Sequence, residues 1–172
     1  MAQAVKKIVK LIAVSLLILQ QGCGVYSFSG ASIPDSMKTV SVQFFENTAT
    51  LVVPYLSQQF TEALKERITS QSRLSIVRSD ADANFEGRIT DYSIIPAAIQ
   101  GNQRAALNRL SITVKVKYTN ALKPELSFEQ SFTEFKEFSI ESKSLQDQER
   151  ELITFLNQKL TEAIFNKAFA NW

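Results

Sequence analysis

The amino-acid sequence predicts an α+β fold, a two-layer sandwich in which two helices pack on one face of a four- to five-stranded mixed sheet, in the order β-α-β-β-β-β-α. Two kinds of periodicity lead to this prediction: several stretches alternate apolar with polar residues, and two others repeat apolar residues every three to four positions. The composition agrees, because 45% of the 172 residues are hydrophobic and only 5 are Gly and 4 are Pro. We therefore expect one packed domain behind a leader.

The N-terminal segment has the three parts of an export signal. Residues 1–22 contain three early lysines, an apolar run over residues 8–19 and a small residue, Gly22, directly before the single cysteine of the chain, Cys23. The run is shorter than the roughly 20 apolar residues that cross a bilayer. We predict that 1–22 is a lipoprotein signal peptide and that Cys23 is the lipid anchor, carrying a covalent diacylglycerol and an N-acyl chain and no other cofactor. Gln20 stands where such signals usually have Leu, which leaves ordinary cleavage with an unmodified Cys23 as the alternative.

The residues after the predicted anchor indicate its destination. Gly24 to Ser27 contain no acidic residue, so we expect neither retention in the inner membrane nor export to the surface. The predicted location is the cell outer membrane, lipid-anchored and facing the periplasm. Residues 23–38 combine several Ser with Gly and Pro, a composition suited to a lipidated tether. A single domain is then expected over residues 39–172.

The first half of this domain is predicted to be strand, helix, strand. Apolar and polar residues alternate over residues 39–45, with Phe44 on the apolar side, which predicts a half-buried strand. Pro54 suits the first turn of a helix, and apolar residues four positions apart predict that helix over residues 55–70. Residues 74–78 predict a second strand, joined to the first by a right-handed crossover if the two are parallel.

The second half is predicted to be three strands and a long helix. Residues 84–95 form the third strand, in which the alternation slips and indicates a bulge near Asp91. The fourth strand covers residues 110–119 and needs one buried and one wet face. Residues 126–138 are expected to return antiparallel to it after a turn. Helical spacing of apolar residues predicts a terminal helix over residues 145–169 on the same sheet face.

Charge and residue types exclude several function classes. Three of the 19 basic residues lie in the leader, so the mature chain has 16 basic and 17 acidic residues, and no nucleic-acid partner is expected. The chain has no His, its five Gly are scattered, and Cys23 is assigned to lipid, which removes the commonest general base, a phosphate loop and a thiol nucleophile. The pairs Asp80 with Asp82 and Glu86 with Asp91 fit a polar turn and a solvated strand face better than catalysis. We predict neither an enzyme nor a metal site.

Cations gather on two neighbouring predicted strands. Arg109, Lys115 and Lys117 share the wet side of the fourth strand. Arg88 has the matching parity on the third strand, and Arg104 lies in the connection between them. If the two strands pair, these residues form a basic stripe suited to a phosphorylated or acidic ligand. The alternative is a sheet face whose charges only keep the domain soluble.

The connection between the third and fourth strands is unusually apolar. It contains Ile94, Ile95, Pro96 and Ile99, whereas surface loops are normally polar. An apolar insertion tip beside a basic stripe would suit an amphiphile with an anionic head group, or a cavity of another protein. The alternative is that the two strands extend further and pack these side chains.

Five segments spread over the mature chain follow one another in a family-specific order. They are GCGVYSFSG (22–30), FTEAL (60–64), FEGRITDY (85–92), NRL (108–110) and IFNKAFANW (164–172). In this order they resemble the LptE family of lipopolysaccharide-assembly lipoproteins. No single segment is diagnostic, so the resemblance depends on their sequence along the chain.

The resemblance implies a lipid-anchored domain inside an LptD-like β-barrel of the outer membrane, where it plugs the lumen, helps the barrel assemble and assists lipopolysaccharide transfer to the cell surface. It implies a chaperone and plug without catalysis, with the membrane, the barrel and lipopolysaccharide as partners. Cys23 would then be the lipidated residue, and the region of Arg104 and Arg109 would face ligand or barrel wall. The alternative is a free-standing periplasm-facing lipoprotein that binds a small amphiphilic ligand or another envelope complex.

Overall fold

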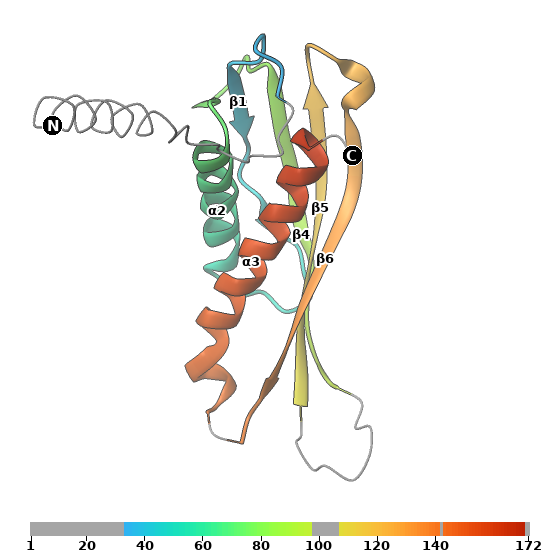
Figure 1. Ribbon diagram of the computed structural model, residues 1–172. Coiled ribbons are helices and arrows are strands. Elements are labelled where there is room, and N and C mark those ends of the chain that lie inside the picture. The colour runs from blue at the N-terminus through green and yellow to red at the C-terminus, as the bar shows by residue number, and fades with distance from the viewer. Residues whose placement is uncertain (1–32, 98–106, 142, 171–172) are drawn as a thin grey trace, which may run out of the picture.

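The computed structural model describes residues 33–97, 107–141 and 143–170, and these form two layers (Figure 1). One layer is a six-stranded mixed sheet, and the other consists of helices α2 (Leu56–Gln71) and α3 (Leu145–Phe169), which lie on the same face of that sheet. The predicted two-layer α+β architecture is therefore confirmed, including the order of its helices and long strands. We call the sheet face that carries the helices the covered face and the opposite one the open face.

The sheet combines a short parallel part with a long antiparallel part. Its strands are β1 (Thr39–Val42), β2 (Glu46–Asn47), β3 (Ser75–Val77), β4 (Ala83–Pro96), β5 (Leu107–Asn120) and β6 (Phe128–Ser139), with a short 3-10 turn, η1 (Pro124–Leu126), before β6. The order across the sheet is β3-β1-β4-β5-β6, and β2 pairs with β4 beyond the end of β1. β1 is parallel to β3 and β4, whereas β4, β5 and β6 are antiparallel to one another. The predicted antiparallel pairing of the last two strands is confirmed.

β4 changes phase in its middle, as the sequence predicts. Phe85 and Ile89 are buried in the first half of the strand and Tyr92 in the second, so inward positions shift from odd to even numbers. The register with β5 skips one residue between Ile89 and Asp91, which is the expected β-bulge. The bulge keeps the apolar side of both halves of β4 on the covered face.

The chain changes phase a second time after β1, and here the sequence prediction is wrong. Alternation predicts one strand over residues 39–45 with Phe44 on its apolar side, but β1 ends at Val42 and Phe44 is 59% exposed. Phe45 is fully buried instead, and its backbone N–H donates to the Thr61 hydroxyl of α2 at 3.1 Å. The irregular step between β1 and β2 turns this side chain inward, and alternation over seven residues does not reveal such a step.

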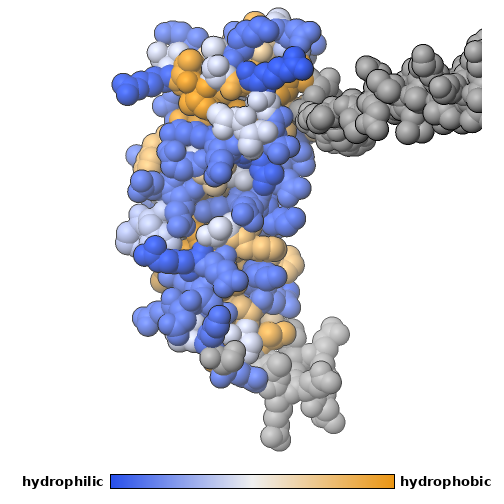
Figure 2. Space-filling model, turned by 60° about the vertical axis from the view of Figure 1, so that its left-hand side comes forward, coloured by the Kyte–Doolittle hydropathy of each residue, from blue (hydrophilic) through white to orange (hydrophobic). Residues whose placement is uncertain are grey.

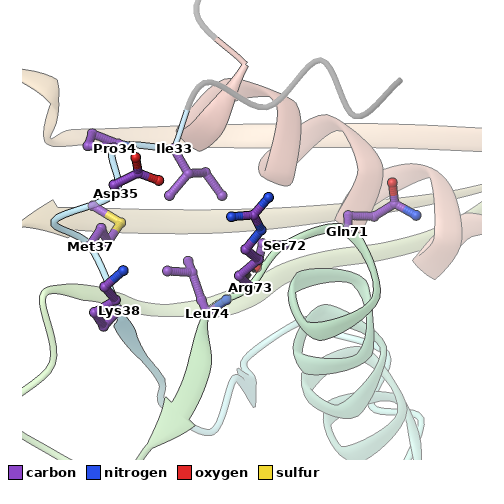
Figure 3. A pocket seen from close by; sticks show the side chains of 9 residues that line it. All are labelled: Ile33, Pro34, Asp35, Met37, Lys38, Gln71, Ser72, Arg73 and Leu74. Carbon is purple, nitrogen blue, oxygen red and sulfur yellow. Dashed lines mark hydrogen bonds between the residues drawn. The ribbon is translucent and has the colours of Figure 1, made fainter. Parts of the chain in front are cut away.

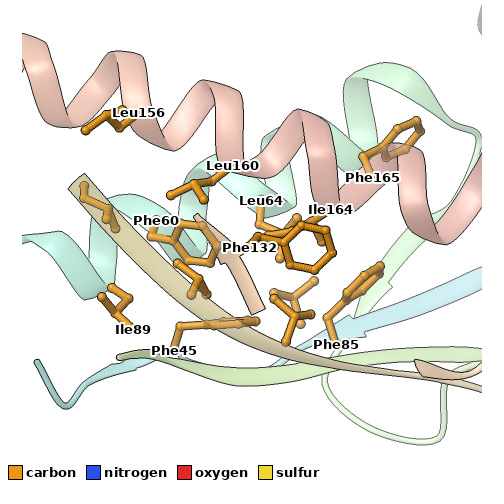
Figure 4. Close-up of a cluster of buried hydrophobic side chains, with 14 of the residues drawn as sticks. Phe45, Phe60, Leu64, Phe85, Ile89, Phe132, Leu156, Leu160, Ile164 and Phe165 are labelled. Carbon is orange, nitrogen blue, oxygen red and sulfur yellow. The ribbon is translucent and has the colours of Figure 1, made fainter. Parts of the chain in front are cut away.

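The core lies between the covered face and the two helices (Figure 4). Residues one turn apart on α2 are fully buried and follow the predicted stripe: Leu56, Phe60, Leu64 and Ile68. Phe60 packs edge-on against Phe45 with ring centroids 5.0 Å apart, and α3 adds Leu156 and Leu160 from above. Full burial of one such side chain contributes about 1.5–3 kcal/mol, so this cluster dominates the stability of the domain. Within the described ranges, neither helix combines the length and apolar character needed to cross a membrane.

Gly87 marks a close approach inside the sheet. A Cβ at this position would lie 2.1 Å from the Lys115 carbonyl oxygen and 2.7 Å from the Phe45 ring. The missing side chain therefore lets β4 and β5 pair while Phe45 packs directly on the strand backbone.

Side-chain hydrogen bonds fix the starts of two elements. The backbone N–H groups of Lys38 and Thr39 donate to the Asp82 carboxylate at 2.8 and 2.9 Å, which joins the start of β1 to the turn before β4. These hydrogen bonds lower the pKa of Asp82, so this residue of the predicted polar turn has a structural role. At the start of α3, the Asp147 N–H donates to the Ser144 hydroxyl at 3.3 Å and caps the helix.

Candidate functional site

The predicted cations that the structure describes lie on the open face. The inward positions of β5 carry buried apolar side chains at even numbers, so Arg109, Lys115 and Lys117 point to the other side. Arg88 of β4 lies directly opposite Lys115 in the register, which brings the two strands of the predicted stripe together. Arg109 lies near the distal end, by which we mean the end of the molecule where β4 ends and β5 begins (Figure 1). Arg104 lies outside the described residues.

Both lysines of the stripe are paired with carboxylates. Lys117 Nζ lies 2.6 Å from Glu86 Oε1, and Lys115 Nζ lies 2.5 Å from Glu129 Oε1. The hydrogen bond to Glu86 raises the pKa of Lys117, and the hydrogen bond from Lys115 lowers the pKa of Glu129. The predicted basic stripe is therefore a mosaic of alternating charge. Glu86 shares the parity of Arg88, but the place of Glu129 beside β5 requires the β5–β6 register.

Arg109 has a different environment. Its guanidinium lies 2.6 Å from Glu137 Oε1 and stands over the Phe135 ring, 4.3 Å from the centroid. Ile95 is opposite Arg109 on β4, and the side chains of Ile95, Leu107 and Phe135 are all exposed. The distal end thus presents apolar groups around one paired cation. Phe135 and Glu137 were not among the sequence candidates, because only the register of β6 places them beside Arg109.

The residues of the predicted apolar tip are part of β4 as far as the structure describes them. Ile94, Ile95 and Pro96 pair with residues of β5, which corresponds to the alternative of longer strands. Ile94 is partly buried and packs against the core, whereas Ile95 and Pro96 are exposed. Ile99 lies outside the described residues. A role of this segment in insertion stays a prediction.

Arg88 is the one stripe cation without an ion pair among the described residues. It lines a shallow depression of about 490 Å³ on the open face, together with Lys115 and the exposed ring of Phe44. Ligand pockets usually enclose most of their ligand, and this depression does not. Glu46, Glu86 and Glu129 also line it, so the depression has mixed charge, in which Arg88 offers one site for an anionic group beside the apolar Phe44 ring. Phe44 was missed as a surface residue because its alternation placed it in the core.

A half-buried carboxylate, that of Glu149, joins the helices to β4. The Tyr92 hydroxyl donates to Glu149 Oε1 at 2.7 Å, and the Tyr55 hydroxyl donates to Glu149 Oε2 at 3.0 Å. Burial and the Glu149 hydrogen bond raise the pKa of Tyr92, and the same two causes raise the pKa of Tyr55. Both phenols therefore stay protonated, and the cluster links the start of α2, β4 and α3 without supplying a nucleophile.

A second depression, of about 250 Å³, lies where the described chain begins (Figure 3). Ile33 and Met37 line it from the entering segment, and Arg73 and Leu74 line it from the turn between α2 and β3. Figure 2 shows a mostly hydrophilic surface with a hydrophobic area near this end of the molecule. The predicted anchor, Cys23, lies outside the described residues, so its lipidation stays a prediction.

The described residues contain no cluster of three or more His, Cys, Asp or Glu that could hold a metal ion. The fold and the surface together define a class of protein: a small α+β domain with one helix-covered sheet face, one open face of mixed charge, and shallow depressions on the surface described above. The chain belongs to the LptE lipopolysaccharide-assembly family, whose model matches residues 37–168. This family of non-catalytic lipoproteins is the one that the sequence resembles.

Solved structures share the fold at low sequence identity. A minor lipoprotein from Acinetobacter baumannii has a TM-score of 0.52 at 14% identity, covering 76% of this chain and 91% of its own. A hypothetical protein from Chlamydia trachomatis has a TM-score of 0.53 at 12% identity, covering 79% of this chain and 100% of its own. Uncharacterized lipoprotein B from Nitrosomonas europaea has a TM-score of 0.50 at 16% identity, covering 78% and 83%. These likenesses support the fold alone, and curated proteins give no match.

Proposed function

We propose that this chain is an outer-membrane lipoprotein, anchored through Cys23 and facing the periplasm, that plugs an LptD-like β-barrel and helps it assemble. In that position it assists the transfer of lipopolysaccharide to the cell surface. The match of the lipopolysaccharide-assembly family over residues 37–168 carries the proposal.

The open face supports a role in contacting a large partner. Three long strands display a field of fixed charges in which Lys115, Lys117 and Arg109 are held by carboxylates. Such paired surface charges give specificity and register to an interface while adding little to the stability of the domain. A free-standing carrier of a small amphiphile would instead use an enclosed apolar cavity, and the depressions beside Arg88 and beside Met37 are both open.

Co-purification of the lipidated chain in mild detergent tests the barrel partner. We expect an outer-membrane barrel protein to be recovered with the wild-type chain. A Cys23→Ala variant that keeps the rest of the chain is the matched control for the anchor, because it changes the attachment to the membrane and no described contact. Recovery of the wild-type chain alone, as a monodisperse species, would favour the free-standing lipoprotein instead.

The lipopolysaccharide contact is tested separately. We expect Arg88→Gln to weaken binding of purified lipopolysaccharide, because this cation has no carboxylate partner among the described residues. Lys65→Gln on α2 removes one half-exposed cation, which is paired with Glu62, from the opposite layer and serves as the control. Binding that is equal in both variants over a range of salt concentrations would remove Arg88 from the contact.

A further inference from the structure

Two segments that are distant in the sequence meet at the second depression described above, which we call the Met37 depression. Residues 33–38 line it from before β1, and residues 71–74 line it from the last residue of α2 and the turn that follows. β1 and β3 pair in parallel, and the Ser75 N–H donates to the Lys38 carbonyl oxygen at 2.9 Å. The strand pairing therefore brings the two lining segments side by side (Figure 3).

Hydrogen bonds fix the backbone on both sides of the Met37 depression. On one side, the Met37 N–H donates to the Pro34 carbonyl oxygen at 3.0 Å and closes a turn. On the other side, the Ser72 hydroxyl donates to the Ile68 carbonyl oxygen at 2.6 Å and accepts from the Leu74 N–H at 3.2 Å. The two turns that line the depression are therefore held in place without a ligand, which lowers the entropy cost of binding one.

Three charged side chains of the Met37 depression have no ion pair among the described residues. They are the cations of Lys38 and Arg73 and the carboxylate of Asp35, and all three residues are exposed. Figure 3 shows that Asp35 and Arg73 enter the depression from its two different segments. Met37 and Leu74 are buried and supply apolar surface between them. The depression thus offers both signs of charge to a ligand, next to apolar side chains.

We propose that the Met37 depression binds the head group of a phospholipid that carries both a phosphate and a primary ammonium group, as in phosphatidylethanolamine. Lys38 and Arg73 bind the phosphate oxygens, and Asp35 accepts hydrogen bonds from the ammonium group. Met37 and Leu74 contact the glycerol part of the lipid. A head group with a phosphate alone leaves the Asp35 carboxylate unpaired beside another anion, which disfavours that lipid.

The place of the depression in the fold agrees with a ligand in the membrane. Ile33 follows the predicted anchor, Cys23, by ten residues, which span at most about 36 Å when fully extended. β1, β3 and β4 all start at this end of the molecule, opposite the distal end. Binding here leaves the distal end and the open face to the barrel, so the inference adds a membrane contact to the proposed function, on which it rests for the anchor. Because the anchor keeps the depression close to lipid, a weak site is sufficient.

Soluble head groups test the recognition of the phosphate. The full-length chain in mild nonionic detergent is titrated with glycerophosphoethanolamine, which carries both charges and no acyl chain, and NMR shifts give the dissociation constant. We expect Arg73→Gln to raise this constant about three- to tenfold, because one charge-assisted contact at an exposed site is lost. Arg78→Gln is the matched control, since Arg78 is an exposed cation outside the depression. Equal binding by the wild-type chain and the Arg73→Gln variant would overturn the proposal.

An Asp35→Asn variant tests the recognition of the ammonium group. We expect it to weaken binding of glycerophosphoethanolamine about three- to tenfold, for the same reason. Binding of glycerophosphoglycerol, which has the phosphate without the ammonium, should not weaken, because the substitution removes a like charge. Weaker binding of both compounds, or equal binding of both by the wild-type chain, would overturn the assignment of Asp35 to the ammonium group.

Chemical protection in vesicles tests the membrane contact without a barrel. Gln71→Cys places a thiol at an exposed position of the Met37 depression. In the lipidated chain, a neutral maleimide should modify it at least about threefold more slowly in vesicles of phosphatidylethanolamine with phosphatidylglycerol than in phosphatidylglycerol alone, because the anchor keeps most sites filled. Thr133→Cys on the open face should react equally in both, and the wild-type chain reports any reaction of Cys23.

Equal protection of the Gln71→Cys thiol in the two kinds of vesicle would overturn head-group binding and leave the barrel partner untouched. Failure to recover a barrel with the lipidated chain would instead overturn the proposed function, while protection in vesicles would still support the head-group site. The two proposals therefore fail in different experiments.

Discussion

The two faces of the long antiparallel sheet depend on different interactions, although alternate residues of the same strands supply them. On β5, Val114 and Val116 are fully buried under the helices. Lys115 and Lys117, which alternate with them, lie on the open face in exposed ion pairs. Burial of apolar side chains contributes several times more to stability than an exposed ion pair. The covered face therefore maintains the fold, and the open face can vary in charge without unfolding the domain.

The largest expected effect compares two phenylalanines on these two faces. Phe85 is fully buried and packs on Tyr118 and Phe169, with ring centroids 4.8 and 5.9 Å away. We expect Phe85→Ala to lower the free energy of unfolding by about 3–5 kcal/mol, from lost burial and the cavity left behind. Phe135 is 52% exposed on the open face, and Phe135→Ala should cost less than about 1 kcal/mol. Urea unfolding followed by circular dichroism measures both, and similar losses would contradict the division between the faces.

A smaller effect is expected at Gly87, where an added side chain would be crowded against the β5 backbone and the Phe45 ring. The Cβ of a Gly87→Ala variant would lie 2.1 Å from the Lys115 carbonyl oxygen, so β4 and β5 must shift apart. We expect a loss of about 1–3 kcal/mol in the free energy of unfolding, as for other overpacked sites. Ser93→Ala on the same strand is the control, because that side chain hydrogen-bonds only to nearby Asp91. A Gly87→Ala variant as stable as wild type would show that β4 and β5 can move apart here without loss of stability.

The dependence of stability on alkaline pH should be a third property of the covered face, through its buried Tyr118. Burial raises the pKa of Tyr118 to about 12, whereas the unfolded chain has a tyrosine pKa near 10. The folded state then holds this proton more tightly, so the contribution of Tyr118 to stability is retained below about pH 10 and falls by about 2 kcal/mol as the pH rises to about 12. Tyr118→Phe removes this contribution while keeping the ring, and leaves the separate losses that the raised pKa values of Tyr92 and Tyr55 cause. Unfolding free energies of the two proteins between pH 9 and 12 check it, and parallel curves would contradict the prediction.

The periodic parts of the fold were predictable because burial sets their periods. The stripe on α2 and the boundaries of α3 follow from helical spacing, and the slip before Tyr92 revealed the bulge in β4. Residues 43–47 were not predictable in this way. A two-residue strand is too short to show a period. The burial of Phe45 in place of Phe44 depends on the tertiary contact of Phe45 with α2.

The candidate site divides along the same line. The parity of single strands correctly placed Arg88, Lys115 and Lys117 on one face. The pairing of Lys115 with Glu129 and of Arg109 with Glu137 could not be predicted, because these carboxylates reach the cations only through the register between β5 and β6. The alternation within one strand therefore predicted the face on which the cations lie. The pairing between strands determined which of them have a carboxylate partner.

The smallest expected effect on stability tests this last point at the distal end. Arg109 and Glu137 are about two-fifths exposed, and an ion pair of this kind is worth about 0–1 kcal/mol. Exchanging them, as Arg109→Glu with Glu137→Arg, should leave the free energy of unfolding within that range, because the pair forms again in the opposite direction. The exchange moves the cation off the Phe135 ring and alters the charge pattern that a partner meets, so binding of lipopolysaccharide or of the barrel should weaken although the fold persists. An exchange that unfolds the domain would mean that the open face also maintains the fold, which would contradict the contrast between the two faces.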